Sequence, residues 1–204
     1  GIRDIYEYGT KLAEKIGAEN VLDFSLGNPS TPAPREVENT IRHIVTELSP
    51  KDYNSYTSAP GDKDSRLAVA KNLNARFGTD YDENNIFLTC GAAASLNIIF
   101  KAIIESEEDE IIVNTPYFPD YKVFIEGQGA KFVLAKCSDD LTLDITELEK
   151  RINVNTKAVL INSPNNPSGI IYPKENIEDL VKMLNRKQKE FAHPIFLISD
   201  EPYR

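Results

Sequence analysis

The chain is poor in the residues that form disulfides and bind metals, with two cysteines and two histidines among 204 residues. Cys90 and Cys137 lie far apart, which excludes a disulfide framework and a metal-ligand pair, and a reducing cytoplasm suits them best. His43 and His193 have no metal-ligand partners beside them in the sequence, which favours surface or packing roles for both.

Basic residues and long apolar runs are also scarce. The 23 lysines and arginines are outnumbered by 32 acidic residues, and the net charge is -9. This argues against nucleic acid or an anionic membrane surface as the main partner, because phosphate backbones require a basic face. No apolar run approaches the roughly 18 residues that span a bilayer, and the N-terminus has mixed charge, unlike a signal peptide. With 41% hydrophobic residues, we expect a globular, cytoplasmic protein with a sizeable core.

A loop rich in proline and glycine interrupts the chain early. Residues 27–34 read GNPSTPAP, which contains too many helix and strand breakers for regular structure. We take this loop as the boundary between residues 1–30 and residues 31–204. Before it, apolar residues at helical spacing predict an amphipathic helix over 2–16. After it, similar spacing predicts helices over 35–48 and 61–77.

From residue 86 onward, short apolar runs alternate with amphipathic segments. We expect helices between successive strands, and the strands are predicted over 86–89, 110–114, 131–135, 157–162 and 195–199. Such alternation implies right-handed βαβ crossovers, and hence an α/β fold in which helices cover both faces of a mostly parallel sheet, in three αβα layers. Ligands in this architecture bind beyond the carboxyl ends of the strands.

Two groups of residues at predicted strand ends could bind a ligand. Residues 89–95 read TCGAAAS, and small side chains let backbone amides at a helix start approach an anion, although tight packing of the helix on the strand explains them equally well. Residues 115–121 read TPYFPDY, whose aromatic rings either cover a flat heteroaromatic ligand or begin a hydrophobic helix.

Two further groups are more specific. Residues 162–169 read NSPNNPSG, in which an asparagine held extended by the following proline can point its amide inward from a rigid turn. Asp200 ends an apolar strand, and Tyr203 follows it. A buried, unpaired anion is costly there, so we expect Asp200 either to face a cation, such as a protonated pyridine nitrogen, or to cap a helix.

In this order, the four groups resemble the class I/II aminotransferases, which are fold-type I enzymes that depend on pyridoxal 5′-phosphate. The resemblance extends from Gly27 to Tyr203. It implies that residues 31–204 form part of the large cofactor-binding domain, and that residues 1–30 belong to the small domain or arm. It also implies the transfer of an amino group between an amino acid and a 2-oxo acid.

The resemblance assigns the cofactor phosphate and ring to particular residues. The phosphate would be held by the backbone that follows Gly91, at Ala92 and Ala93. Phe118 would stack on the pyridine ring, at a position where relatives often have tryptophan or tyrosine.

Three more residues would bind the polar atoms of the ring. Asn166 and Tyr203 would hydrogen-bond the ring hydroxyl, and Asp200 would pair with the ring nitrogen. An anion at that position keeps the nitrogen protonated, which makes the ring an electron sink for the substrate carbanion.

The resemblance also implies a homodimer with its sites at the subunit boundary. Tyr56 matches the tyrosine that reaches a phosphate across that boundary, and Gly27 matches a loop glycine near the substrate carboxylate.

In the family, the lysine that forms a Schiff base with the cofactor follows the Asp-x-x-Tyr motif by a few tens of residues, which is beyond Arg204. We therefore expect the chain to be the N-terminal portion of such an enzyme, with no catalytic residue of its own. We expect it to be inactive alone, and to bind the cofactor weakly and without a covalent bond at most. The alternatives are a fold-type I β-lyase or decarboxylase, or a non-catalytic binding or assembly domain whose sheet edge pairs with a partner.

Overall fold

The structure is a computed structural model that describes residues 2–24, 27 and 31–203. By contacts, the chain divides into two compact units, Gly1–Tyr56 and Thr57–Arg204, and each is described here by itself. The sequence predicts a domain boundary between residues 30 and 31. The division by contacts does not test that boundary, which stays a prediction.

The first unit is helical. It contains α1 (Ile2–Ile16), the 3-10 helix η1 (Ala18–Asn20), α2 (Arg35–Glu47) and the short α3 (Pro50–Tyr53). The helices predicted over 2–16 and 35–48 are therefore confirmed, with α2 ending one residue earlier. α1 stops before Gly17, whose φ of 93° lies in a region that glycine adopts more readily than other residues.

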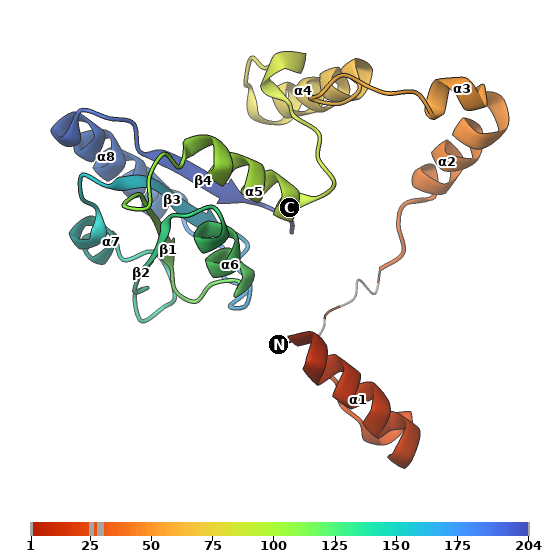
Figure 1. The fold of residues 1–204 in the computed structure, drawn as a ribbon, viewed down its shortest axis with the longest axis horizontal. Coiled ribbons are helices and arrows are strands. Elements are labelled where there is room, and N and C mark those ends of the chain that lie inside the picture. Colours follow the sequence, from red (N-terminus) through yellow and green to blue (C-terminus); the bar gives the residue numbers. More distant parts are fainter. Residues whose placement is uncertain (1, 25–26, 28–30, 204) are drawn as a thin grey trace. The chain divides into compact units, whose positions relative to one another are not determined.

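The second unit is a four-stranded parallel sheet with helices on both faces, preceded by α4 (Lys63–Phe77) and η2 (Glu83–Asn85) (Figure 1). The strands lie in the order β2-β1-β3-β4, and their bounds are Glu110–Asn114 for β1, Lys131–Ala135 for β2, Thr156–Asn162 for β3 and Phe196–Asp200 for β4. The remaining helices are α5 (Ala92–Ile103), α6 (Asp120–Gly127), α7 (Ile145–Arg151) and α8 (Lys174–Phe191). The predicted three-layer α/β fold is confirmed.

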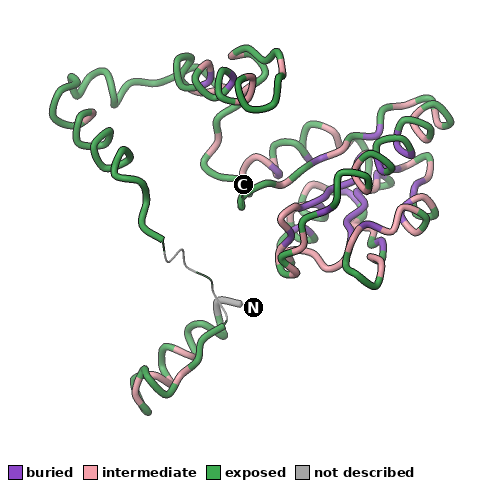
Figure 2. The backbone as a smooth tube through the Cα atoms, turned by 180° about the vertical axis from the view of Figure 1, so that it is seen from behind, coloured by how far each residue is buried: buried purple, intermediate pink, exposed green. Residues whose placement is uncertain are grey.

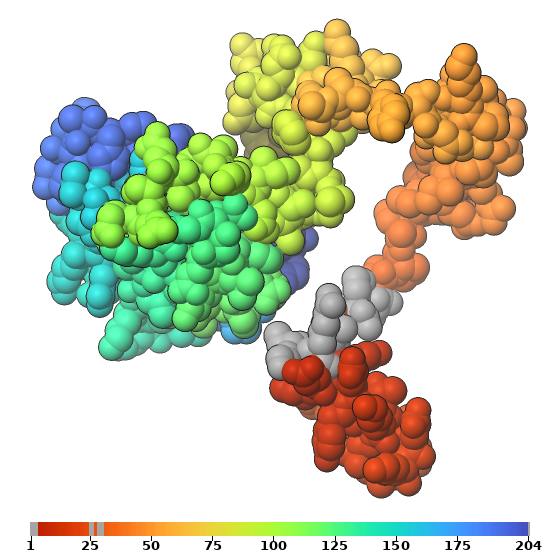
Figure 3. Space-filling model, in the orientation of Figure 1, coloured from red at the N-terminus to blue at the C-terminus, as the bar shows by residue number. Residues whose placement is uncertain are grey.

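Alternation along the strands gives the sheet two apolar faces. On β1, Ile111 and Val113 pack with residues of α5 and α6, whereas Ile112 packs with residues of α7 and α8. Figure 2 shows the buried residues gathered along the strands and the inner sides of these helices. In Figure 3, the green atoms of α5 and α6 form much of the surface that the second unit presents to the viewer. Burial on both faces explains why the strands read as continuous apolar runs.

The strand predicted over 86–89 is wrong, because this segment is irregular. A strand needs a ladder of backbone hydrogen bonds, and the bond given for this segment runs from the Leu88 N–H to the Pro60 carbonyl at 2.9 Å. Phe87 is 55% exposed, so its side chain is not buried against a sheet in the described part of the chain. The other four predicted strands are confirmed within one residue at each end.

Candidate functional site

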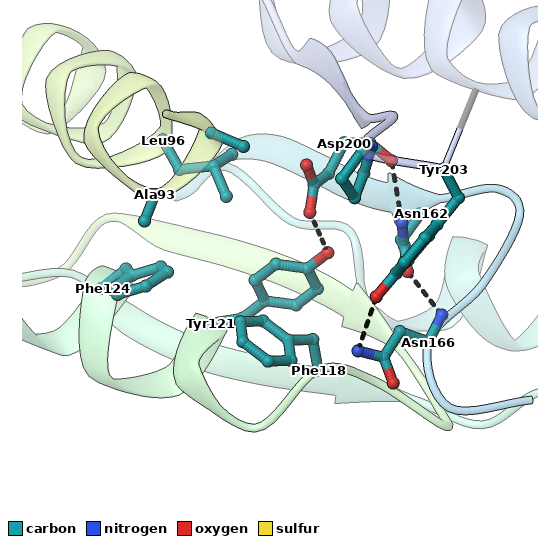
Figure 4. Close-up of a pocket in the computed structure, with 11 residues that line it drawn as sticks. Ala93, Leu96, Phe118, Tyr121, Phe124, Asn162, Asn166, Asp200 and Tyr203 are labelled. Atoms are coloured by element: carbon teal, nitrogen blue, oxygen red, sulfur yellow. Dashed lines mark hydrogen bonds between the residues drawn. The ribbon is translucent and has the colours of Figure 1, made fainter. Parts of the chain in front are cut away.

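A pocket of about 200 Å³ lies at the carboxyl ends of β3 and β4, beside α5 and α6 (Figure 4). Because all four strands are parallel, their carboxyl ends share one edge of the sheet, where the residues that follow them can converge. The pocket brings together six of the residues singled out in the sequence: Ala92, Ala93, Phe118, Asn166, Asp200 and Tyr203.

Asp200 is the last residue of β4, where it pairs in register with Asn162 of β3. Its Oδ2 atom accepts a hydrogen bond from the Tyr121 hydroxyl at 2.5 Å. In the described part of the chain, no lysine, arginine or histidine forms an ion pair with Asp200, and it caps no helix. The carboxylate is therefore anchored by a neutral donor, and one of its oxygens remains available to a ligand.

Tyr121 lies on α6 and is 2% exposed. The pKa of Tyr121 is raised well above its usual value, mainly by burial and next by the hydrogen bond to Asp200. The phenol therefore stays protonated and remains a donor. Phe118, two residues before α6, meets the Tyr121 ring edge to face, with 5.5 Å between centroids and 80° between planes.

Asn162, the buried last residue of β3, connects the loops of the site. Its Nδ2 donates to the Asp200 backbone carbonyl at 2.8 Å, and its Oδ1 accepts from the Asn166 backbone N–H at 2.6 Å. Asn166 in turn donates from Nδ2 to the Tyr203 hydroxyl at 3.0 Å. These three bonds join the end of β3, the turn after it and the turn after β4 (Figure 4).

The turn that holds Asn166 is fixed by Asn165 rather than by Asn166 itself. Asn165 is 6% exposed, and its Oδ1 accepts from the Ser168 N–H at 3.2 Å and the Ser168 hydroxyl at 2.7 Å. Its Nδ2 donates to the carbonyl of Pro116, in the loop after β1. Asn165 thus uses its amide structurally and leaves the Asn166 amide beside the pocket.

The start of α5 forms another wall of the pocket. Gly91 is the N-cap with a φ of 110°, and the Ala94 and Ser95 N–H groups donate to its carbonyl. Ala92 and Ala93 follow it in the first helical turn, where backbone N–H groups have no partner within the helix. These N–H groups and the helix dipole make this end suited to an anion. Gly91 itself does not line the pocket.

Two residues singled out in the sequence belong to the first unit. Tyr56 is fully exposed there, and Gly27 lies between residues 25–26 and 28–30, which are outside the described part of the chain. Their assignment to the site stays a prediction.

Five residues that line the pocket were given no role from the sequence: Leu96, Tyr121, Phe124, Asn162 and Pro202. Tyr121 and Asn162 belong to the groups 115–121 and 162–169, but neither was assigned a contact of its own. For Asn162, the available signal is a polar residue that ends an apolar strand and directly precedes the Ser163–Gly169 turn. Tyr121 has helical spacing with Ile125, which resembles ordinary core packing. Nothing local marks its hydroxyl as part of a site.

The described residues contain no group of three or more His, Cys, Asp or Glu side chains placed to hold a metal ion. Among the same residues, no helix combines the length and apolar character needed to cross a membrane.

The family model "Aminotransferase class I and II" matches residues 19–204. The aspartate aminotransferase of Thermotoga maritima is 31% identical over 188 residues, which is 91% of this chain and 47% of that protein. The aspartate aminotransferase of Sulfurisphaera tokodaii is 27% identical, over 98% of this chain and 48% of its own length.

Solved structures show the same likeness. A crystal structure of an aminotransferase from Eubacterium rectale superposes with a TM-score of 0.96 at 48% identity, covering 100% of this chain and 51% of that one. The aspartate aminotransferase of Thermus thermophilus, solved with maleate, superposes with a TM-score of 0.84 at 25% identity, covering 99% and 50%. This chain spans about half the length of the relatives it matches.

Proposed function

This chain belongs to the class I and II aminotransferases, a family that depends on pyridoxal phosphate, and from this premise we propose that it forms the ring-binding part of a cofactor site. The enzyme would transfer an amino group between an amino acid and a 2-oxo acid. One observation carries the proposal: Asp200, a carboxylate without a cationic partner among the described residues, lines a small pocket at the strand ends.

The residues present fit the cofactor. A pocket of about 200 Å³ is smaller than the roughly 300–1,000 Å³ typical of drug-sized ligands, which suits a single-ring compound. The Asp200 carboxylate lines one side of the pocket, and the first helical turn of α5, at Ala92 and Ala93, lines another with backbone N–H groups that have no partner within the helix. A protonated ring nitrogen and a phosphate need these two kinds of group.

When bound, pyridoxal phosphate supplies an electron sink for charge that develops at the substrate α-carbon. Asp200 would hold a proton at the ring nitrogen by opposing its positive charge. The Asn166 amide and Tyr203 hydroxyl lie 3.0 Å apart, so both can reach a single ring hydroxyl oxygen. Phe118 would cover one face of the ring and exclude water from it.

The phosphate would bind the first-turn N–H groups of α5 beyond Gly91. This contact is remote from the reacting carbon, so its binding energy would help to orient the ring rather than take part in the chemistry.

The remaining assignments belong to the same proposal. Tyr56 would reach the phosphate of a partner subunit in a homodimer, and Gly27 would lie near the substrate carboxylate. Residues 1–30 would belong to the small domain or arm. Two free cysteines, Cys90 and Cys137, support a cytoplasmic location. Because the relatives from Thermotoga maritima and Sulfurisphaera tokodaii are named aspartate aminotransferases, aspartate is the first amino donor to test.

Binding of pyridoxine 5′-phosphate tests the ring site directly, because this analogue has no aldehyde and cannot form a Schiff base. We expect calorimetry to show one site per chain, and Asp200→Asn to weaken binding at least about tenfold through loss of the counter-charge. Asp179→Asn is the matched control, because Asp179 is an exposed residue of α8 that pairs with Lys182. Equal affinity in the wild type and Asp200→Asn would remove Asp200 from the site.

A further inference from the structure

The buried Tyr121 hydroxyl donates the one hydrogen bond that the Asp200 carboxylate accepts among the described residues, and the proposed function does not use it. We propose that Tyr121 is a positioning residue: its hydroxyl holds one oxygen of the Asp200 carboxylate, so that the other oxygen is left to accept a hydrogen bond from the protonated ring nitrogen. This inference rests on the proposed function, since it concerns how that site orients its anion.

Packing fixes the position of the Tyr121 ring. The ring is 2% exposed and belongs to the same buried cluster as Leu96, Phe100 and Ile125. Phe118 closes one side of it, edge to face. A ring enclosed in this way has little rotational freedom, so the hydroxyl is presented at one place at the pocket wall.

The hydrogen bond itself has the character of a strong one. The 2.5 Å between the Tyr121 hydroxyl and Asp200 Oδ2 is at the short end of the range for a hydroxyl donating to a carboxylate, and such charge-assisted bonds are about twice as strong as neutral ones. It joins residues 79 positions apart in the chain. It therefore ties α6 to the end of β4 through side chains alone.

No other described side chain orients the Asp200 carboxylate. The bond from Asn162 reaches the Asp200 backbone carbonyl and fixes the main chain only. Asp200 has two side-chain torsions, which Asn162 leaves free to rotate. Tyr121 is therefore the described group that selects one carboxylate orientation.

The competing explanation is that the bond to Asp200 only provides the buried Tyr121 hydroxyl with a hydrogen-bond partner, which buried tyrosine hydroxyls usually have. The two explanations differ in what they predict for the ligand. If the bond only satisfies the phenol, its loss lowers the free energy of unfolding but leaves the ring nitrogen of a bound cofactor unchanged. If the bond positions Asp200, its loss changes the protonation of that nitrogen.

The test uses Tyr121→Phe, which removes the hydroxyl alone. Two quantities are measured: the dissociation constant of pyridoxine 5′-phosphate, and the ¹⁵N NMR shift of its ring nitrogen when labelled and bound. We expect about tenfold weaker binding, which corresponds to about 1.4 kcal/mol. We also expect the ¹⁵N signal to move from the pyridinium position toward that of neutral pyridine.

Tyr117→Phe is the matched control. Tyr117 lies four residues earlier, its ring packs 5.1 Å from that of Phe132, and its hydroxyl makes no hydrogen bond with a described residue. We expect it to leave both quantities as in the wild type.

A double-mutant cycle with Asp200→Asn shows whether Tyr121 acts through Asp200. In the Asp200→Asn background, Tyr121→Phe should change the dissociation constant less than about twofold. An undiminished tenfold effect there would overturn the positioning role.

The outcomes separate the two proposals. If the wild type does not bind pyridoxine 5′-phosphate, the proposed function fails and the role of Tyr121 fails with it. Suppose instead that the wild type binds the analogue and that Asp200→Asn shifts the ¹⁵N signal. If Tyr121→Phe then leaves the signal unchanged, only the role of Tyr121 is overturned. If Tyr121→Phe does not fold, 4-fluorophenylalanine at position 121 keeps the ring and fills the space of the hydroxyl, but it cannot donate a hydrogen bond to Asp200. An unchanged ¹⁵N shift in that protein would equally overturn the inference.

Discussion

Replacing Asn162 by alanine should loosen the site and lower the stability of the second unit together. The Asn162 side chain is 3% exposed and makes two hydrogen bonds, to the Asp200 carbonyl and from the Asn166 N–H. In Asn162→Ala both backbone groups lose their partner at the edge of the pocket.

The expected magnitude follows from these two bonds. Each net hydrogen bond contributes about 0.5–1.5 kcal/mol, and a buried group left unpaired costs about 1–3 kcal/mol. Because the pocket is open enough for water to reach one of the two groups, we expect a loss of about 2–4 kcal/mol in the free energy of unfolding.

Hydrogen exchange followed by mass spectrometry, read at peptides from β3 and β4, measures this loss where it occurs. Asn176→Ala is the matched control: its amide also makes two hydrogen bonds, with the N–H and carbonyl of Leu143, away from the pocket. Both variants should lose stability, but only Asn162→Ala should weaken binding of pyridoxine 5′-phosphate. The reasoning is refuted if Asn162→Ala exchanges as slowly as the wild type at β4, or if both variants bind the analogue equally.

Three further predictions concern the rest of the second unit. Asp109→Ala removes a buried acceptor of the Glu105 and Ser106 N–H groups and should cost about 2–3 kcal/mol near neutral pH in urea titrations. Burial raises the pKa of Asp109, but these bonds and Lys157 outweigh it and hold the pKa below its usual value, so its contribution should be lost as pH falls below about 4. Gly61→Ala should lower the melting temperature more than Gly78→Ala, because both have positive φ but only at Gly61 would a Cβ lie 2.8 Å from the Leu88 Cβ; equal effects would contradict the clash. Gly91→Ala should weaken binding of pyridoxine 5′-phosphate about tenfold, because strain at a φ of 110° displaces the start of α5, and calorimetry would show unchanged binding if that start can tolerate a side chain.

Much of the fold could be predicted from the sequence, because both faces of the sheet are buried and its strands therefore read as apolar runs. Helix α8 is one of the helices expected between successive strands, and its apolar residues Ile177, Leu180 and Leu184 have helical spacing. The segment 86–89 is an apolar run like the four strands, but it forms no strand. Whether an apolar run becomes a strand depends on a pairing partner, and no local pattern supplies that information.

The site, like the fold, could be predicted only in part from the sequence. Asn166, Asp200 and Tyr203 stood out because each follows a strand in a constrained motif, and the structure places all three at one pocket. The ring of Tyr121 fell within the aromatic group 115–121, but its hydroxyl did not stand out. The hydroxyl's partner is Asp200, 79 residues later, and a tyrosine at helical spacing is otherwise a core residue. Local sequence marks residues that end strands, but it does not mark residues that reach the site through a packed helix.

The register of β4 on β3 has a consequence for how the site could fail. β4 lies at the edge of the sheet that the described residues form, and in it Ile198 and Asp200 point to one face while Leu197 and Ser199 point to the other. If β4 slipped by one residue toward its carboxyl end, Ser199 would occupy the place of Asp200, and Leu197 and Ile198 would each turn to the opposite face of the sheet. The bond from Asn162 to the Asp200 carbonyl opposes such a slip at the last rung of the ladder. A single amide on the neighbouring strand thus sets which side chain the edge strand presents to the pocket.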